Sequence, residues 1–212
     1  MKSRAVALYP ELERYISVVV SEIDRIPAGR QEELDRLAGF VAGQAAAGQP
    51  SRLTFICTHN SRRSQLAQVW AKTAAEYFGV PAVETYSGGI EATAFDARAA
   101  AALARSGFRV EVRSEGENPV YVVRYAAHTP PVECFSKVYG QPPNPVRGFC
   151  AVMTCSSADE ACPIVAGAAA RISLPYQDPK DFDGTDQEGA AYEDRCRQIA
   201  REMLAAFSRV HV

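Results

Sequence analysis

Short buried strands alternate with amphipathic helices from residue 52 to residue 207, and no other feature of the sequence narrows the fold as much. The expected strands are "LTFIC", "AVETYSGG", "FCAVMTC" and "ARISLPY". Apolar residues at helical spacing predict helices over 62–78, in "DARAAAALARSGF" and over 187–207. Strands and helices in this alternation form a parallel sheet with helices on both faces. We therefore predict an α/β fold.

The first fifty residues predict a pair of helices. Apolar residues recur at helical spacing over 11–26 and again at Leu34 and Val41, and "GQAAAGQP" ends the second helix as a linker. We predict an N-terminal helical extension, residues 1–50, that packs against the helices of the sheet or against another subunit. The α/β domain then comprises residues 51–212.

Residues 111–147 interrupt the alternation. They contain "NPVYVVRYAAHTPP" and "VECFSKVYGQPPNP", and proline is confined to the edges of sheets and to bulges. We predict an insert in the α/β domain, a hairpin or an excursion, with a strand near 119–125. The insert is expected to cover the active site or to form a dimer contact, and a homodimer is left open.

Overall charge and hydropathy exclude several classes of protein. The formal net charge of −2 argues against a broad nucleic-acid-binding surface. No apolar run is long enough to cross a membrane, and the N-terminus lacks the basic-then-apolar order of a secretory signal. We expect a cytoplasmic protein with neither a nucleic-acid nor a membrane partner.

The six cysteines are unevenly spaced, and a chain of 212 residues does not need a disulfide framework. Because there is no short CxxC pair and the three histidines are scattered, no metal site is predicted, and no cofactor is expected. Cys134, Cys150 and Cys196 are interpreted as small buried hydrophobes. The other three cysteines lie in segments that indicate chemistry.

The stretch "FICTHNSRRSQ", residues 55–65, places a thiol where a buried strand meets a loop and a helix. Ligands of parallel sheets bind at the carboxyl ends of the strands, and amides that precede a helix can surround an anion. Arg63 can grip two oxygens of a tetrahedral oxyanion, and Ser64 can donate to the Cys57 sulfur. We predict a phosphate-binding loop with Cys57 as nucleophile. The expected substrate contacts are Thr58, His59, Asn60, Ser61, Arg62, Arg63 and Ser64.

Residues 53–70 resemble the active-site loop of the low-molecular-weight protein tyrosine phosphatase superfamily. "FICTHNSRRSQLA" is most similar to the thioredoxin-coupled arsenate reductases of that superfamily, and "YSGGIE" resembles its second strand and turn. The resemblance covers roughly residues 52–110 and 148–207. It implies a four-stranded parallel sheet flanked by helices, with flavodoxin-like winding.

In "PYQDPKD", Asp178 and Pro179 resemble the aspartate-proline loop of the superfamily. Proline restrains the residue before it to an extended conformation, which fixes the direction of the carboxyl group. The resemblance implies that Asp178 is the general acid that protonates the departing oxygen.

In "VMTCSSADEACPI", Cys155 and Cys162 lie seven residues apart. The arsenate reductases carry a cysteine pair at this spacing, and the resemblance implies a thiol relay. Cys57 attacks arsenate, Cys155 attacks the Cys57 sulfur as arsenite leaves, and Cys162 then attacks Cys155. Thioredoxin is the implied reductant of the final Cys155–Cys162 disulfide, for which Cys162 must move toward Cys155.

Two loop positions depart from the pattern of the superfamily. His59 replaces the usual glycine and is expected to narrow the mouth of the pocket or to require an unusual backbone angle. Arg62 stands where the superfamily often has a cysteine, and we interpret it as solvated rather than as a second anion contact.

Two enzymatic functions follow, and arsenate reduction is the leading one because it uses all three of Cys57, Cys155 and Cys162. The alternative is a phosphatase of phosphotyrosine or small phosphate esters, which would use only Cys57, Arg63 and Asp178. Lys180, after Pro179, argues against an aromatic-lined slot for phosphotyrosine. A third reading, an oxyanion-sensing or redox-sensing protein without catalysis, leaves the complete catalytic set unexplained.

Overall fold

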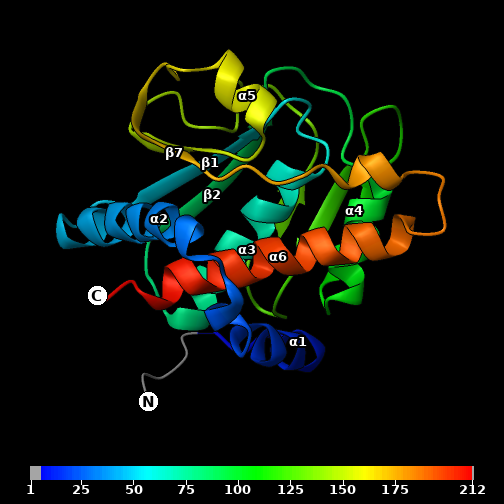
Figure 1. The fold of residues 1–212 in the computed structure, drawn as a ribbon, viewed down its shortest axis with the longest axis horizontal. Coiled ribbons are helices and arrows are strands. Elements are labelled where there is room, and N and C mark those ends of the chain that lie inside the picture. The colour runs from blue at the N-terminus through cyan, green and yellow to red at the C-terminus, as the bar shows by residue number, and fades with distance from the viewer. Residues whose placement is uncertain (1–5, 212) are drawn as a thin grey trace.

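The computed structural model describes residues 6–211 (Figure 1). Residues 1–5, the start of the predicted N-terminal extension, and residue 212 lie outside the described residues. The helices are α1 (Pro10–Val20), η1 (Ile23–Arg25), α2 (Ala28–Ala46), α3 (Arg63–Phe78), α4 (Ala97–Arg105), α5 (Ser156–Ala161), η2 (Pro179–Phe182) and α6 (Glu188–Ser208). The strands are β1 (Ser51–Cys57), β2 (Val83–Gly89), β3 (Arg109–Ser114), β4 (Val120–Arg124), β5 (Val132–Cys134), β6 (Phe149–Met153) and β7 (Ala168–Ser173).

The main sheet is parallel and four-stranded, in the order β2-β1-β6-β7. Numbered within the sheet this order is 2-1-3-4, so the predicted fold class and its flavodoxin-like winding are confirmed. β1 pairs with β2 on one side and with β6 on the other, and the direction of winding therefore reverses at β1. Ligands bind at such a switch point in open α/β sheets. Cys57, the last residue of β1, occupies it.

The two faces of the sheet are covered differently. Leu53 and Phe55 of β1 share a large hydrophobic core with Trp70 of α3 and Phe207 of α6. Figure 1 shows α6 crossing over α3 on this side. The opposite face carries a smaller apolar cluster that includes residues of β1, β6 and the short helix α5. This smaller cluster contains Cys57.

The N-terminal helices are part of the large core. Leu12 and Ile16 of α1 and Leu34 and Leu37 of α2 are fully buried in it, and both helices pack against α6. The prediction that the extension packs against the helices of the sheet is thereby confirmed. The domain boundary at residue 50 itself stays a prediction.

The insert contains more structure than a hairpin. β3, β4 and β5 form an antiparallel sheet of their own, and β4 is the strand expected near 119–125. β3 begins at Arg109, before the predicted start of the insert at residue 111. Val110 and Val112 alternate with charged residues in β3, but almost all of its side chains are exposed. None of the helices in the described part of the chain is long and apolar enough to cross a bilayer.

Candidate active site

The loop between β1 and α3 holds the Cys57 thiol at the base of a small polar pocket. Cys57 is 3% exposed, and its Sγ lies 3.1 Å from Ser64 Oγ. Asn60 Nδ2 donates to the same Ser64 oxygen at 2.8 Å. The Ser64 hydroxyl is thus oriented by Asn60 and can donate to a thiolate, as expected from the sequence. The unusual backbone angle falls on Asn60, with φ of 49°, and not on His59.

Arg63 and Asp178 form the opposite wall of the pocket. Arg63 Nη2 lies 2.7 Å from Asp178 Oδ2, and Arg63 Nη1 donates to the carbonyl of Tyr176 at 3.0 Å. Arg63 Nε is buried, and no described atom accepts a hydrogen bond from it. The Arg63 guanidinium is therefore fixed in place and retains a donor. The pocket is lined by Cys57, His59, Ser61, Arg62, Arg63 and Asp178.

Asp178 is held as a carboxylate by its surroundings. It precedes Pro179 in extended conformation, and its Oδ1 accepts from the backbone N–H of Lys180 at 3.2 Å. Burial alone would raise the pKa of the Asp178 carboxyl, but Arg62 and Arg63 outweigh it and bring the pKa below its usual value. Asp178 thus lines the pocket with its charged form favoured, and its role as general acid stays a prediction.

The interpretation of Arg62 as a solvated residue is wrong. Arg62 is only 8% exposed, and its Nε and Nη2 donate to the two oxygens of Asp178 at 2.7 and 3.1 Å. Arg62 Nη1 contacts Asp96 Oδ2 at 3.4 Å. The sequence shows neither carboxylate near residue 62, because Asp96 and Asp178 come from distant segments. Arg62 was expected to contact substrate, but its guanidinium is paired with the carboxylates of Asp96 and Asp178.

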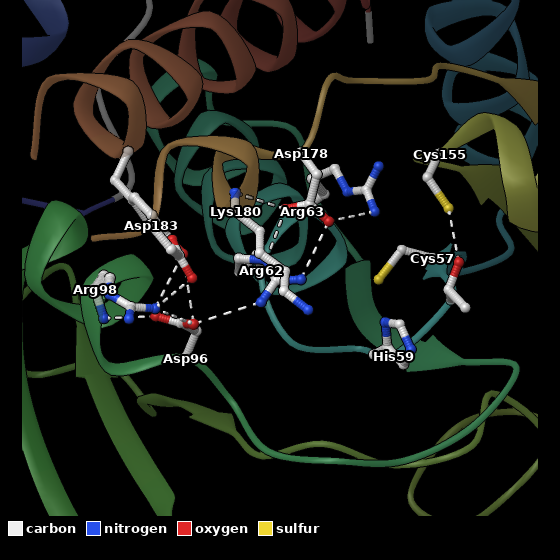
Figure 2. A network of polar contacts seen from close by, with 12 residues as sticks. Cys57, His59, Arg62, Arg63, Asp96, Arg98, Cys155, Asp178, Lys180 and Asp183 are labelled. Carbon is white, nitrogen blue, oxygen red and sulfur yellow. Dashed lines mark hydrogen bonds and ion pairs between the residues drawn. The ribbon is translucent and has the colours of Figure 1, made fainter. Parts of the chain in front are cut away.

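The other expected contacts surround the pocket in different ways. His59 lines the pocket, and its Nε2 lies 2.8 Å from Glu91 Oε1. The Ser61 carbonyl accepts from the backbone N–H of Asp96 at 2.9 Å. Thr58 Oγ1 lies 3.5 Å from Cys155 Sγ. In Figure 2, Arg62, Arg63 and Asp178 are drawn on one side of Cys57, and Cys155 on the other.

Cys57, Cys155 and Cys162 lie in or against the small apolar cluster on one face of the sheet. Cys57 and Cys155 are buried members of it, and the half-buried Cys162 packs against it. Cys155 caps the N-terminus of α5 and Cys162 its C-terminus, and all three thiols are free. The buried state expected for Cys134, Cys150 and Cys196 is confirmed, and burial raises the pKa of Cys134 and of Cys150 to about 12. Only the first three thiols share a cluster beside the pocket.

The insert forms hydrogen bonds to the loop between β1 and α3, a role that the sequence did not indicate. The backbone N–H of Lys137 donates to Asn60 Oδ1 at 3.0 Å, and Ser136 Oγ donates to the His59 carbonyl at 2.8 Å. Gln65 Nε2 donates to the Phe135 carbonyl at 2.8 Å. Lys137 is itself buried, which lowers its pKa to about 8. Residues 135–137 therefore fix the loop that carries Cys57.

No group of three or more His, Cys, Asp or Glu side chains within residues 6–211 is placed to hold a metal ion. The chemistry that this arrangement can support is nucleophilic attack by a thiolate on an oxyanion, followed by thiol exchange.

Comparison with known proteins agrees with this geometry. Residues 52–120 match the family described as low molecular weight phosphotyrosine protein phosphatase. This match lies within the α/β domain and supports its resemblance to the low-molecular-weight protein tyrosine phosphatase superfamily. The resemblance expected from the loop sequence is thereby confirmed.

Curated relatives within the superfamily are named arsenate reductases. That of Halalkalibacterium halodurans is 27% identical over 73% of this chain and 92% of its own length. That of Bacillus subtilis is 26% identical over the same shares. A solved structure, the thioredoxin-dependent arsenate reductase of Corynebacterium glutamicum, matches with a TM-score of 0.40 and 20% identity over 88% of this chain and 81% of that one.

Proposed function

We propose that this protein is an arsenate reductase that works through a relay of Cys57, Cys155 and Cys162. The observation that carries the proposal is that these three free thiols lie in or against one small cluster beside the Arg63 pocket. A phosphatase needs only the first of them. The curated relatives that bear the name arsenate reductase support the same assignment.

In the first step, the Cys57 thiolate attacks arsenic and an arsenate oxygen leaves with a proton as hydroxide or water. Arg63 Nε, buried and without a described acceptor, faces the charge that the oxyanion brings. The Ser64 hydroxyl, 3.1 Å from the sulfur, stabilises the thiolate before attack and again when it departs. The product of this step is a Cys57–arsenic(V) thioester.

In the second step, Cys155 attacks the Cys57 sulfur and the electron pair of the sulfur–arsenic bond passes to arsenic, which leaves as arsenite. Cys155 Sγ lies 3.5 Å from Oγ1 of Thr58, and Thr58 is the residue next to Cys57. The attacking thiol therefore lies beside the loop that carries Cys57. Cys162 then attacks Cys155 and returns Cys57 to the thiolate. Two electrons have moved from the protein to arsenic, and one disulfide remains.

The last disulfide requires an external dithiol, and we assign this role to a thioredoxin-type protein. Cys162 is the most exposed of the three thiols and lines a cavity of about 470 Å³. The cavity is otherwise lined by uncharged residues, among them Tyr139, Val146 and Phe149. Val146 of this lining is 64% exposed, and Ile164, two residues after Cys162, is 85% exposed. An uncharged apolar surface suits a protein partner better than a small charged thiol.

The test is arsenate-dependent NADPH consumption in the presence of thioredoxin and thioredoxin reductase. The parent protein is expected to turn over, Cys57→Ser and Cys155→Ser to be inactive, and Cys162→Ser to stop after one turnover. Cys150→Ser, which changes a buried cysteine outside the cluster, is the matched control and should retain activity. Turnover by Cys162→Ser at the parent rate would contradict the relay.

A phosphatase is the second candidate, favoured by the complete loop and by Asp178 beside it. Hydrolysis of para-nitrophenyl phosphate, run beside the reductase assay, separates the two. Phosphate release without arsenate-dependent consumption of NADPH would leave Cys57 and Arg63 as a hydrolytic site.

A further inference from the structure

Arg62 clamps the carboxylate that would serve as the proton donor of the site. Its Nε and Nη2 meet Asp178 Oδ1 and Oδ2 at 2.7 and 3.1 Å, the parallel two-bond geometry that makes arginine–carboxylate pairs strong. Both partners are largely buried, with side-chain exposures of 9% for Arg62 and 19% for Asp178. A pair so placed is screened little by solvent.

Arg62 is in turn anchored from its other side. Asp96 Oδ2 lies 3.4 Å from Arg62 Nη1, and the Asp96 side chain caps α4 by accepting from the Arg98 backbone N–H at 2.8 Å. The Arg98 side chain bridges Asp96 and Asp183. Figure 2 shows this chain of charges running from Asp183 to Asp178. The Arg62 guanidinium therefore has little freedom to leave Asp178.

The cations around Asp178 outnumber the anions. Arg62 and Arg63 contact it directly, and Arg195 of α6 attracts it from the side. Asp96, beyond Arg62, is the nearest opposing carboxylate in this network. Cys57, His59 and Ser61 complete the lining of the pocket that Asp178 shares with Arg62 and Arg63. This arrangement favours a carboxylate over a carboxylic acid at residue 178.

We propose that Arg62 is a positioning residue that holds Asp178 as a bound carboxylate and so restrains it from donating a proton, which selects against phosphate esters with poor leaving groups. In ester hydrolysis the Cys57 thiolate forms a bond to phosphorus while the bond to the ester oxygen breaks. The departing oxygen must take a proton from Asp178, or leave as a free anion. Water then attacks the phosphocysteine and releases phosphate and the thiolate.

Arsenate does not place the same demand on Asp178. Arsenic–oxygen bonds exchange much faster than phosphorus–oxygen bonds, so a bound oxyanion can lose an oxygen with less help from an acid. A clamped Asp178 would thus affect ester hydrolysis far more than attack on arsenate. The proposed role of the Arg62–Asp178 ion pair does not depend on the thiol relay of Cys57, Cys155 and Cys162.

The experiment compares the parent protein with Arg62→Gln in two measurements. The first is the carbon-13 NMR titration of the Asp178 carboxyl, assigned as the signal absent from Asp178→Asn. The titration midpoint is expected to move to higher pH in Arg62→Gln. The second is the hydrolysis rate of para-nitrophenyl phosphate and of phenyl phosphate, whose leaving group is the poorer one. We expect phenyl phosphate hydrolysis to rise about tenfold in Arg62→Gln, with para-nitrophenyl phosphate little changed.

Asp96→Asn is the matched control because it removes a carboxylate from the network but neither partner of the Arg62–Asp178 pair. It is expected to leave the Asp178 midpoint unchanged or to lower it. Thermal unfolding monitors the fold of each variant. If Arg62→Gln does not fold, Arg62→Lys replaces it, because lysine keeps the charge without the two-bond geometry. Arg62→Lys should show a smaller rise in the Asp178 titration midpoint and in the rate of phenyl phosphate hydrolysis.

A purely structural role for Arg62 would lower the melting temperature without moving either readout. An unchanged Asp178 midpoint in folded Arg62→Gln, or in folded Arg62→Lys if Arg62→Gln does not fold, would overturn the proposal. The titration needs no turnover, so this result is distinct from a failure of arsenate reduction.

Discussion

At the scale of the residue, Asp178 shows how a functional carboxylate also contributes to folding. It is held by two arginines within a mostly buried site, and the hydrogen bonds and charges lower its pKa despite burial. A carboxyl group with a depressed pKa stabilises the fold above its unfolded pKa of about 3.9. The contribution is lost as the pH falls through the lower, folded value.

We therefore predict that Asp178→Asn destabilises the protein at pH 7, by roughly 1–2 kcal/mol. The difference between the two proteins should shrink as the pH is lowered below 4, because the parent carboxylate then becomes protonated. Urea unfolding at a series of pH values measures this difference in the free energy of unfolding between the parent and Asp178→Asn. A difference that stays constant down to pH 2 would mean that the ion pairs do not stabilise the fold.

At the scale of the element, helix α5 keeps the thiols of Cys155 and Cys162 apart. It has six residues between Cys155 and Cys162. At about 1.5 Å rise per residue, the helix separates their Cα atoms by more than the ~7 Å that a disulfide allows. Helix α5 must therefore unwind before Cys162 can reach Cys155.

Arg171 of β7 restrains this motion. Its Nη2 contacts Asp159 Oδ1 at 2.6 Å, and its Nε donates to the Cys162 carbonyl at 3.1 Å. We predict that Arg171→Gln speeds Cys155–Cys162 disulfide formation about fivefold, the equivalent of ~1 kcal/mol for a lost hydrogen bond. Mass spectrometry after timed exposure to oxidised glutathione measures the rate. Arg52→Gln, which removes an ion pair on β1, is the control and should match the parent.

The contact between the insert and β2 depends on a residue without a side chain. A Cβ on Gly88 would overlap the backbone of Tyr139, which lies two residues beyond the segment 135–137 that supports the Cys57 loop. We predict that Gly88→Ala destabilises the protein by about 1–3 kcal/mol and lowers activity, since the insert must shift. Gly140→Ala, where nothing lies within 4 Å, is the control. Equal unfolding midpoints for the two variants in urea would show that the contact is loose.

At the scale of the whole molecule, the N-terminal helices stabilise the α/β domain. Arg30 of α2 and Glu202 of α6 form a largely buried ion pair at 2.9 Å. Loss of one partner leaves a buried charge, so Arg30→Ala should cost about 3 kcal/mol. Arg36→Ala, which breaks exposed pairs on the same helix, should cost less than ~1 kcal/mol. Chemical denaturation of both variants tests whether the extension is integral to stability.

The features that could be predicted from the sequence are those set by residues close together in the chain. The central strands β1 and β6 are almost wholly buried, and their alternation with the helices predicted the fold class. The loop of Cys57 and Arg63 lies on contiguous residues. The clamp of Arg62 between Asp96 and Asp178 was missed because its partners are 34 and 116 residues away. The support by Lys137 was missed because it is made by a backbone N–H, which no side chain reveals.

The central claim is that electrons for arsenic come from three thiols of this chain. The most direct measurement is a single turnover: reduced protein is mixed with arsenate without any reductant, and arsenite and disulfides are counted. We predict one arsenite per chain and one disulfide, mapped by mass spectrometry to Cys155 and Cys162, with Cys57 returned to the thiol. Absence of arsenite, or arsenite formed while Cys155 and Cys162 both remain reduced, would contradict the account.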